Sequence, residues 1–146
     1  MQLTRNFSLE EMTHSPTAEA KGIDNTPPGL VIQQLAALCE KVLQPIRDRF
    51  GPCRVDSGYR CPELNTCVHG EKHSQHLLGQ ACDFKPLHAT LREVADWILE
   101  NLVFDEMIYE ANTWIHVSYR LDGANRKKAL TASFTNGAAH YVPYRA

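Results

Sequence analysis

The residues with the clearest chemistry lie in two segments, 74–83 and 114–117. The first contains His76 and Asp83, and the second contains His116 between apolar neighbours. Imidazole nitrogens and carboxylate oxygens are common ligands of zinc. Any one histidine taken alone is better explained as a surface or hydrogen-bonded residue, since a metal site needs several ligands in suitable geometry. Three protein ligands with one open position are typical of a water-activating catalytic zinc ion, and three candidates are present here.

His76 and Asp83 can share an ion only if the chain between them folds back. In an extended chain their seven-residue separation would span about 23 Å. Gly79 is the natural hinge for the reversal. After it, residues 81–84 predict a short buried strand, in which a carboxylate is costly unless it is paired or bound to a metal. Burial therefore favours a ligand role for Asp83.

His116 is expected in a hairpin. Residues 107–109 and 114–119 predict two strands, joined by a turn over 110–113. Alternation along the second strand places Trp114 and His116 on one face and the apolar residues between them on the other. The first of these faces is polar enough to line a cleft.

Composition predicts one soluble globular domain of 146 residues, with 43% hydrophobic residues and a net charge of −2. No apolar run approaches the roughly 20 residues of a membrane span, and residues 1–7 lack the apolar stretch of a secretion signal. The compact basic run at 126–128 is interpreted as a solvated turn, so nucleic acid is not an expected partner. We expect a monomer that is made in the cytoplasm and does not associate with membranes.

The five cysteines form an odd set without a Cys-x-x-Cys pair. This pattern suggests neither a closed disulfide framework nor a thiolate metal site, and most are expected to be free and buried. Cys82 lies close to the candidate ligands and could be a nucleophile. Strand alternation disfavours this role, because it directs the thiol away from the face that carries Asp83.

Helices are expected in three places. Residues 8–11 have the form of a capping box and predict a short helix that ends before Pro16. Apolar residues at intervals of three and four predict a longer helix over 30–50, which Pro45 should kink or divide. A third amphipathic helix is predicted over 90–102, again with a capping box at its start.

The remaining strands complete the expected architecture. Residues 54–60 predict a strand that leads into a loop through 61–62, and residues 129–134 predict another, after which the tail is weakly informative. We expect an α+β fold with a small, mainly antiparallel sheet that carries the metal ligands and with the long helices packed on its outer face. The loops between 57 and 83 would form one wall of a cleft, and the hairpin would form the other.

Three motifs resemble the zinc D-Ala-D-Ala carboxypeptidases and related peptidoglycan peptidases of the M15 type: Ser57-Gly58-Tyr59-Arg60, Ser74-x-His76-x-x-Gly79-x-Ala81-x-Asp83 and Trp114-Ile115-His116. The likeness extends from about Asn6 to about Ser133 and is closest to the small single-domain forms of bacteriophages and prophages. It implies the DD-peptidase or Hedgehog-like fold, a single zinc peptidase domain over 1–146 and one zinc ion.

The resemblance also implies roles for individual residues. His76, Asp83 and His116 would bind the zinc ion. Arg60 would project into the cleft and stabilise the negative charge on the attacked carbonyl, and Ser74 would hydrogen-bond the substrate peptide. The alternatives are a surface ion pair for Arg60 and a helix or turn cap for Ser74.

The chain departs from the family pattern at the general base. Many relatives carry Glu or Asp three residues before the last histidine, but this position is Thr113, and Glu110 is the nearest carboxylate and the substitute candidate. A two-residue loop over 111–112 would pair Glu110 with Thr113 and turn it away from His116, whereas a longer loop or a bulge would reverse this parity. Asp105 and Glu106 are expected to be exposed charges. His69, His73 and Gln75 could add substrate contacts, but each is better explained as an exposed loop residue.

Two functions of different classes are compatible with these features. The first is zinc-dependent hydrolysis of a peptide bond next to a D-amino acid in peptidoglycan stem peptides, by a DD-carboxypeptidase or an endopeptidase. In this hypothesis Glu110 is the base and Arg60 stabilises the oxyanion. The second is a non-hydrolytic relative that keeps zinc for folding and serves as a wall-binding or phage structural module. We expect release by lysis or packaging in a virion.

Overall fold

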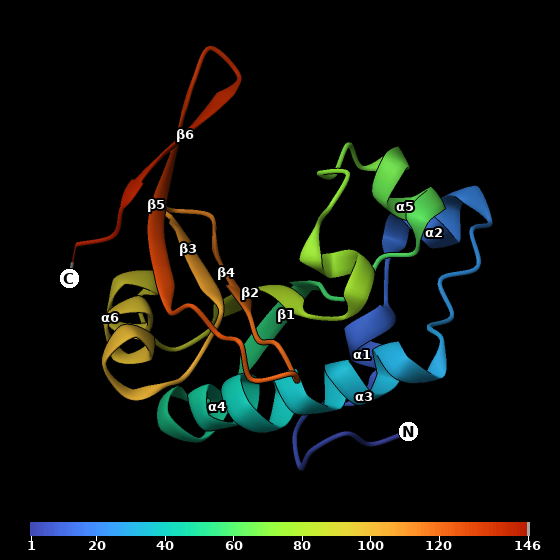
Figure 1. Cartoon of the computed structure of the whole chain (residues 1–146), viewed down its shortest axis with the longest axis horizontal. Helices are drawn as coiled ribbons and strands as arrows, with labels where there is room; N and C mark the ends of the chain where they lie inside the picture. Colours follow the sequence, from blue (N-terminus) through green and yellow to red (C-terminus); the bar gives the residue numbers. More distant parts are fainter. Residues whose placement is uncertain (146) are drawn as a thin grey trace.

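The computed structural model describes residues 1–145 and has an α+β fold built on one six-stranded sheet (Figure 1). The helical segments are α1 (Leu9–Thr13), α2 (Pro16–Lys21), α3 (Gly29–Leu38), η1 (Cys39–Leu43), α4 (Gln44–Phe50), α5 (Pro62–Cys67), η2 (Gln75–Leu78) and α6 (Leu91–Asn101). The strands are β1 (Cys53–Ser57), β2 (Ala81–Pro86), β3 (Glu106–Glu110), β4 (Trp114–Ser118), β5 (Lys128–Thr135) and β6 (Ala138–Pro143). The α+β class predicted from the sequence is confirmed.

The strands follow the order β1-β2-β4-β3-β5-β6. The pair β3–β5 is parallel, and the other four pairings are antiparallel. The sheet is therefore mixed, and the sequence contained no signal for the parallel pairing. The last two strands form a hairpin that projects from the body of the molecule (Figure 1).

One face of the sheet is buried by helices. The fully buried side chains of this face belong to the main hydrophobic core together with residues of α3, η1, α4 and α6, and they are Cys82, Phe84, Met107, Ile115 and Val117. Because strand side chains alternate, the residues between them point to the opposite face. That opposite face carries Asp83 and His116, and it is the face on which the site lies.

The predicted long helix forms as three consecutive helical segments. Pro45 lacks an N–H and its ring crowds the carbonyl four residues earlier, which would normally interrupt an α-helix. Here the preceding turn η1 is a π-helix, in which the Gln44 N–H bonds to the carbonyl of Cys39. The wider turn provides room for Pro45, and the chain continues into α4 instead of breaking.

Helix caps account for most helix starts. The Ser8 hydroxyl caps α1, and Thr90 forms the predicted capping box at α6. Helices α2 and α5 were not predicted, and the expected loop at 61–62 is in fact the start of α5. Both helices begin with proline at the first position after a capping side chain, Ser15 or Cys61. Within residues 1–145, no helix is long and apolar enough to cross a membrane.

Candidate metal centre and active site

The three candidate ligands come together from separate elements. His76 lies in η2, Asp83 in β2 and His116 in β4, and their ligand atoms all lie within 4.8 Å of one another. The β2–β4 register pairs Asp83 directly with His116. Gly79 ends η2 in the left-handed conformation, with φ of 71°, and turns the chain into β2. The predicted reversal between His76 and Asp83 is thus confirmed.

Hydrogen bonds orient the ligand atoms. The Asp83 carboxylate lies 2.9 Å from His116 Nδ1 and 3.3 Å from His76 Nε2. On its other side, His76 Nδ1 lies 2.7 Å from the carbonyl oxygen of Gly58. Donation to this carbonyl places the ring proton on Nδ1 and leaves the lone pair of Nε2 directed at Asp83, as is usual for metal-binding histidines.

The electrostatics of the group also suit a cation. Burial alone would raise the pKa of Asp83, but its contacts with His116 and His76 outweigh this effect and hold the pKa well below its usual range. Burial lowers the pKa of His76, so the neutral imidazole is favoured. An ionised carboxylate and neutral imidazoles are the forms that coordinate metals. The residues therefore fit a metal ion held by His76 Nε2, the Asp83 carboxylate and His116 Nδ1.

Arg60, which the family resemblance expects in the cleft, lies beside this group. Its Nη2 is 3.7 Å from Asp83 Oδ2, while Nε and Nη1 donate to Ser57 Oγ and Asn65 Oδ1 at 3.2 and 3.0 Å. The side chain is largely buried. A Cβ on Gly70 would lie 2.0 Å from Asn65 Oδ1 and 2.8 Å from Arg60 Nη1. Only glycine at this position lets the loop approach the guanidinium group.

Ser74 has the capping role that the sequence left open as an alternative. Its Oγ accepts a hydrogen bond from the backbone N–H of His76 at 3.2 Å and forms the N-cap of η2. The residue also lines the cleft. It therefore helps to fix the turn that carries His76, and it remains available to a bound ligand.

Glu110 lies on the same face of the sheet as His116. In the β3–β4 register, Glu110 pairs with Trp114 and Ile108 pairs with His116. The loop thus contains three residues, 111–113, and Asn112 adopts a positive φ of 63°. Of the two parities left open by the sequence, the structure has the one that turns Glu110 toward the metal ligands. Burial, together with the charge of Asp83, raises the pKa of Glu110.

These groups line one cleft of about 910 Å³. One wall is formed by residues 68–76, and the other by side chains of β3, β4, β5 and β6. This agrees with the walls expected from the sequence, except that β5 and β6 extend the second wall. His69 and His73 are exposed at the rim, as expected.

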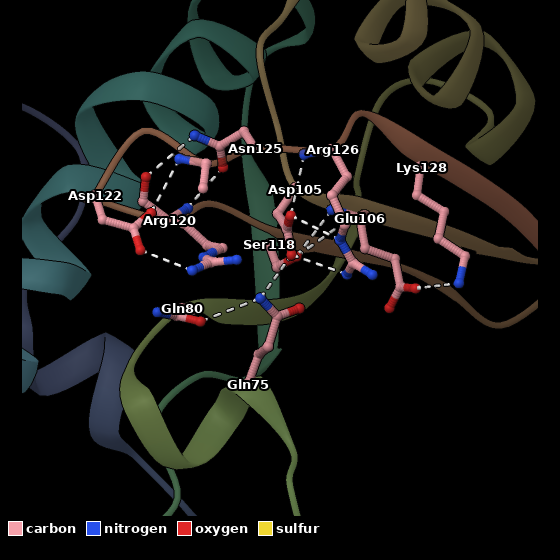
Figure 2. Close-up of polar contacts among 11 residues, drawn as sticks. Gln75, Gln80, Asp105, Glu106, Ser118, Arg120, Asp122, Asn125, Arg126 and Lys128 are labelled. Carbon is pink, nitrogen blue, oxygen red and sulfur yellow. Dashed lines mark hydrogen bonds and ion pairs between the residues drawn. The ribbon is translucent and has the colours of Figure 1, made fainter.

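A buried carboxylate, that of Asp105, binds two side chains that line the cleft. Figure 2 shows Asp105 between Arg126 and Gln75. The Nε and Nη2 atoms of Arg126 each donate to the Asp105 carboxylate at 3.0 Å, and Gln75 Nε2 donates to it at 2.9 Å. Asp105 is only 1% exposed. The interpretation of Asp105 and Gln75 as exposed residues is therefore wrong. Residues 126–128 are exposed, as expected, although Arg126 also pairs with Asp105. Arg126 and Gln75 lie 21 and 30 residues from Asp105 in the chain, so no local sequence pattern indicates these contacts.

The cysteines take no part in the site. All five are free thiols, and Cys82 is fully buried on the helix-covered face of the sheet. Burial raises the pKa of Cys82 well above its ordinary value, which keeps it in the unreactive thiol form. The parity argument against a Cys82 nucleophile is consistent with this position.

Comparison with known protein families identifies the family of this chain. The model of the family described as Peptidase M15 matches residues 5–118. The matched range includes the three candidate ligands, Arg60 and Glu110, and it ends before β5. No curated protein matches the chain significantly. Because the match covers well over half of its length, the chain belongs to the peptidase M15 family.

Proposed function

We propose that the protein is a zinc-dependent peptidase that hydrolyses a peptide bond next to a D-amino acid in peptidoglycan stem peptides. The observation that carries this proposal is the position of Glu110 in the same cleft as the three converging ligands and on the same sheet face as Asp83 and His116. Membership of the peptidase M15 family supports the reaction class. The non-hydrolytic alternative does not account for a half-buried carboxylate at this position.

The ligand set favours zinc over harder cations. Two imidazole nitrogens and one carboxylate suit zinc, whereas magnesium and calcium prefer oxygen ligands alone. Three protein ligands leave one position open, which is the arrangement of catalytic zinc sites. When bound, zinc would lower the pKa of a water molecule and polarise the scissile carbonyl.

Glu110 is proposed as the general base. In its ionised form it takes a proton from the water that attacks the carbonyl carbon, and it returns this proton to the nitrogen of the leaving amine as the C–N bond breaks. A pKa raised by burial suits both steps, because a base that must also act as an acid works best close to the ambient pH.

Arg60 is proposed to stabilise the oxyanion that forms during attack. Its guanidinium group is held in place by Ser57 and Asn65, so it need not reorganise as charge develops. In a partly dry cleft such a fixed cation stabilises negative charge far more than it would in bulk water. Ser74, whose oxygen already accepts from the His76 N–H, retains its hydroxyl proton to donate to a substrate carbonyl.

The stereochemistry of the substrate tests this proposal. The zinc-loaded protein is incubated with a stem peptide that ends in D-Ala-D-Ala and with the same peptide ending in L-Ala-L-Ala, and the products are identified by mass spectrometry. We expect cleavage of the first peptide and little or none of the second. If neither is cleaved although one zinc ion is bound per chain, the non-hydrolytic alternative is correct.

A further inference from the structure

The β5–β6 hairpin carries two exposed aromatic side chains into the cleft. Phe134 is 60% exposed and Tyr141 is 53% exposed, and both line the same cleft as Glu110. The hairpin projects beyond the body of the molecule (Figure 1). Large aromatic groups that stay exposed while lining a cleft offer an apolar surface on which a bound molecule can pack.

The strand register explains why both rings face the cleft. On β5–β6, Ala132 pairs with Tyr141, and Phe134 lies two residues beyond Ala132 on the same face. On β3–β5, Glu110 pairs with Ala132. Phe134 and Tyr141 therefore lie on the face that carries Glu110 and, through β4, His116. Their orientation is set by the backbone pairing.

The electrostatic environment of Tyr141 agrees with this position. Burial, followed by the carboxylates of Glu110 and Glu71, raises the pKa of the Tyr141 hydroxyl. Glu110 belongs to the sheet wall and Glu71 to the 68–76 wall. The hydroxyl thus lies within reach of charges on both walls, as expected for a group inside the cleft.

The length of the cleft exceeds the needs of a terminal dipeptide. From Asp83 on β2 to Tyr141 on β6 it crosses four strand spacings, in the order β2-β4-β3-β5-β6. At about 4.8 Å for each spacing this is about 19 Å. An extended peptide spans about 3.4 Å per residue, so the cleft has room for about five residues, whereas a dipeptide covers about 7 Å.

We propose that Phe134 and Tyr141 form an aromatic ledge that binds the part of the stem peptide remote from the scissile bond. This inference rests on the proposed function and names the substrate of that site as an extended peptide of at least about four residues. Aromatic side chains suit this role, because they offer a large rigid surface and lose little conformational entropy on binding. The ledge lies outside the range matched by the family model, residues 5–118.

Steady-state kinetics with a long and a short substrate test the ledge. The substrates are a complete stem pentapeptide and an N-acylated D-Ala-D-Ala dipeptide, and the variant carries both Phe134→Ala and Tyr141→Ala. We expect the double substitution to lower kcat/KM for the pentapeptide about tenfold more than for the dipeptide, mainly through KM. Val142→Ala is the matched control, because Val142 is exposed on the opposite face of the same hairpin and pairs with Thr131.

A binding measurement separates this inference from the proposed function. Affinity for the pentapeptide is measured by calorimetry with Glu110→Gln protein, with and without the ledge substitutions, so that turnover is not required. If the wild type hydrolyses neither peptide but the ledge substitutions weaken pentapeptide binding about tenfold, the proposed function fails and the ledge stands. If both peptides are hydrolysed and the double variant keeps the wild-type preference and affinity, the ledge is wrong. If the ledge substitutions weaken the binding of muropeptides that carry a disaccharide but not the binding of the pentapeptide, the assignment of the ledge to the peptide is wrong.

Discussion

Glu110 and His116 lie on the same face of the β3–β4 hairpin, because Glu110 pairs with Trp114, two residues before His116. The three-residue loop between the strands produces this parity, with Asn112 in the left-handed conformation. We propose that this carboxylate, on the end of β3, takes the place of the one that the family resemblance implies at the position of Thr113. The reaction centre keeps its proposed base although the residue comes from the neighbouring strand.

Replacing Glu110 tests this substitution directly. Glu110→Gln keeps the size of the side chain but cannot accept the proton of the attacking water, so we expect kcat to fall by about 10²–10⁴-fold. Thr113→Ala is the control, since Thr113 only donates to the Ala111 carbonyl within the loop, and it should leave kcat close to the wild-type value. A greater loss in Thr113→Ala than in Glu110→Gln would mean that the base has been misassigned.

Metal binding should depend on the ligands and not on neighbouring histidines. Zinc at 100 times its Kd should stabilise the wild-type fold by about 2.7 kcal/mol, which appears as a rise in Tm. His116→Ala should lose this rise and the bound zinc, as measured by elemental analysis. His69→Ala should retain both, because His69 is exposed at the rim of the cleft. One tightly bound zinc ion in His116→Ala would contradict the assigned ligand set.

Gly70 should be required for activity without binding metal or substrate. The Cβ of Gly70→Ala would overlap Asn65 Oδ1 and crowd Arg60 Nη1, so the guanidinium group must move. We expect kcat/KM to fall by about 100-fold while zinc content is unchanged, because small displacements of a catalytic group have effects of this size. Gly29→Ala is the control, since its Cβ would have no neighbour within 4 Å. Wild-type kinetics in Gly70→Ala would argue against a catalytic role for Arg60.

The ion pair of Asp105 should contribute stability that depends on pH. Burial alone would raise the pKa of Asp105, but hydrogen bonds from Arg126 and Gln75 outweigh it and lower this pKa. A carboxyl with a lowered pKa in the folded state stabilises the protein above its unfolded pKa of about 3.9, and this contribution is lost as the pH falls through the folded pKa.

Urea unfolding of Asp105→Asn at pH 7 and pH 3 measures this contribution. At pH 7 we expect the free energy of unfolding to fall by about 1–3 kcal/mol, with solvent at the half-exposed Arg126 limiting the effect. At pH 3 the difference from wild type should be smaller. Asp122→Asn removes an exposed ion pair with Arg120 and should change little at either pH. A difference for Asp105→Asn that grows toward pH 3 would exclude the assigned pairing.

The sequence predicted best those features that arise within short segments. The spacing of His76, Gly79 and Asp83 required a reversal at the glycine, and the structure has it. Caps at Ser8 and Thr90 located two helix starts, since a capping side chain bonds to a backbone group only three residues away. Such local signals do not depend on the rest of the fold.

Features that depend on distant partners could not be predicted in the same way. Asp105 looks like a surface charge until Arg126 is placed opposite it by the parallel pairing of β3 with β5. The sheet face on which Glu110 lies depends on the length of the β3–β4 loop. The residue types of Ala111, Asn112 and Thr113 do not determine this length. Strand β6 was missed because its residues are exposed along its whole length, so it lacks the alternation of a half-buried strand.

Zinc-dependent hydrolysis is best tested by the turnover of a stem peptide ending in D-Ala-D-Ala, measured before zinc removal, after chelation and after zinc is restored. We expect cleavage that disappears on chelation, returns with one zinc ion per chain and is absent from zinc-loaded Glu110→Gln protein. Cleavage that continues in the chelated protein, or no cleavage by the fully zinc-loaded wild type, would contradict this expectation.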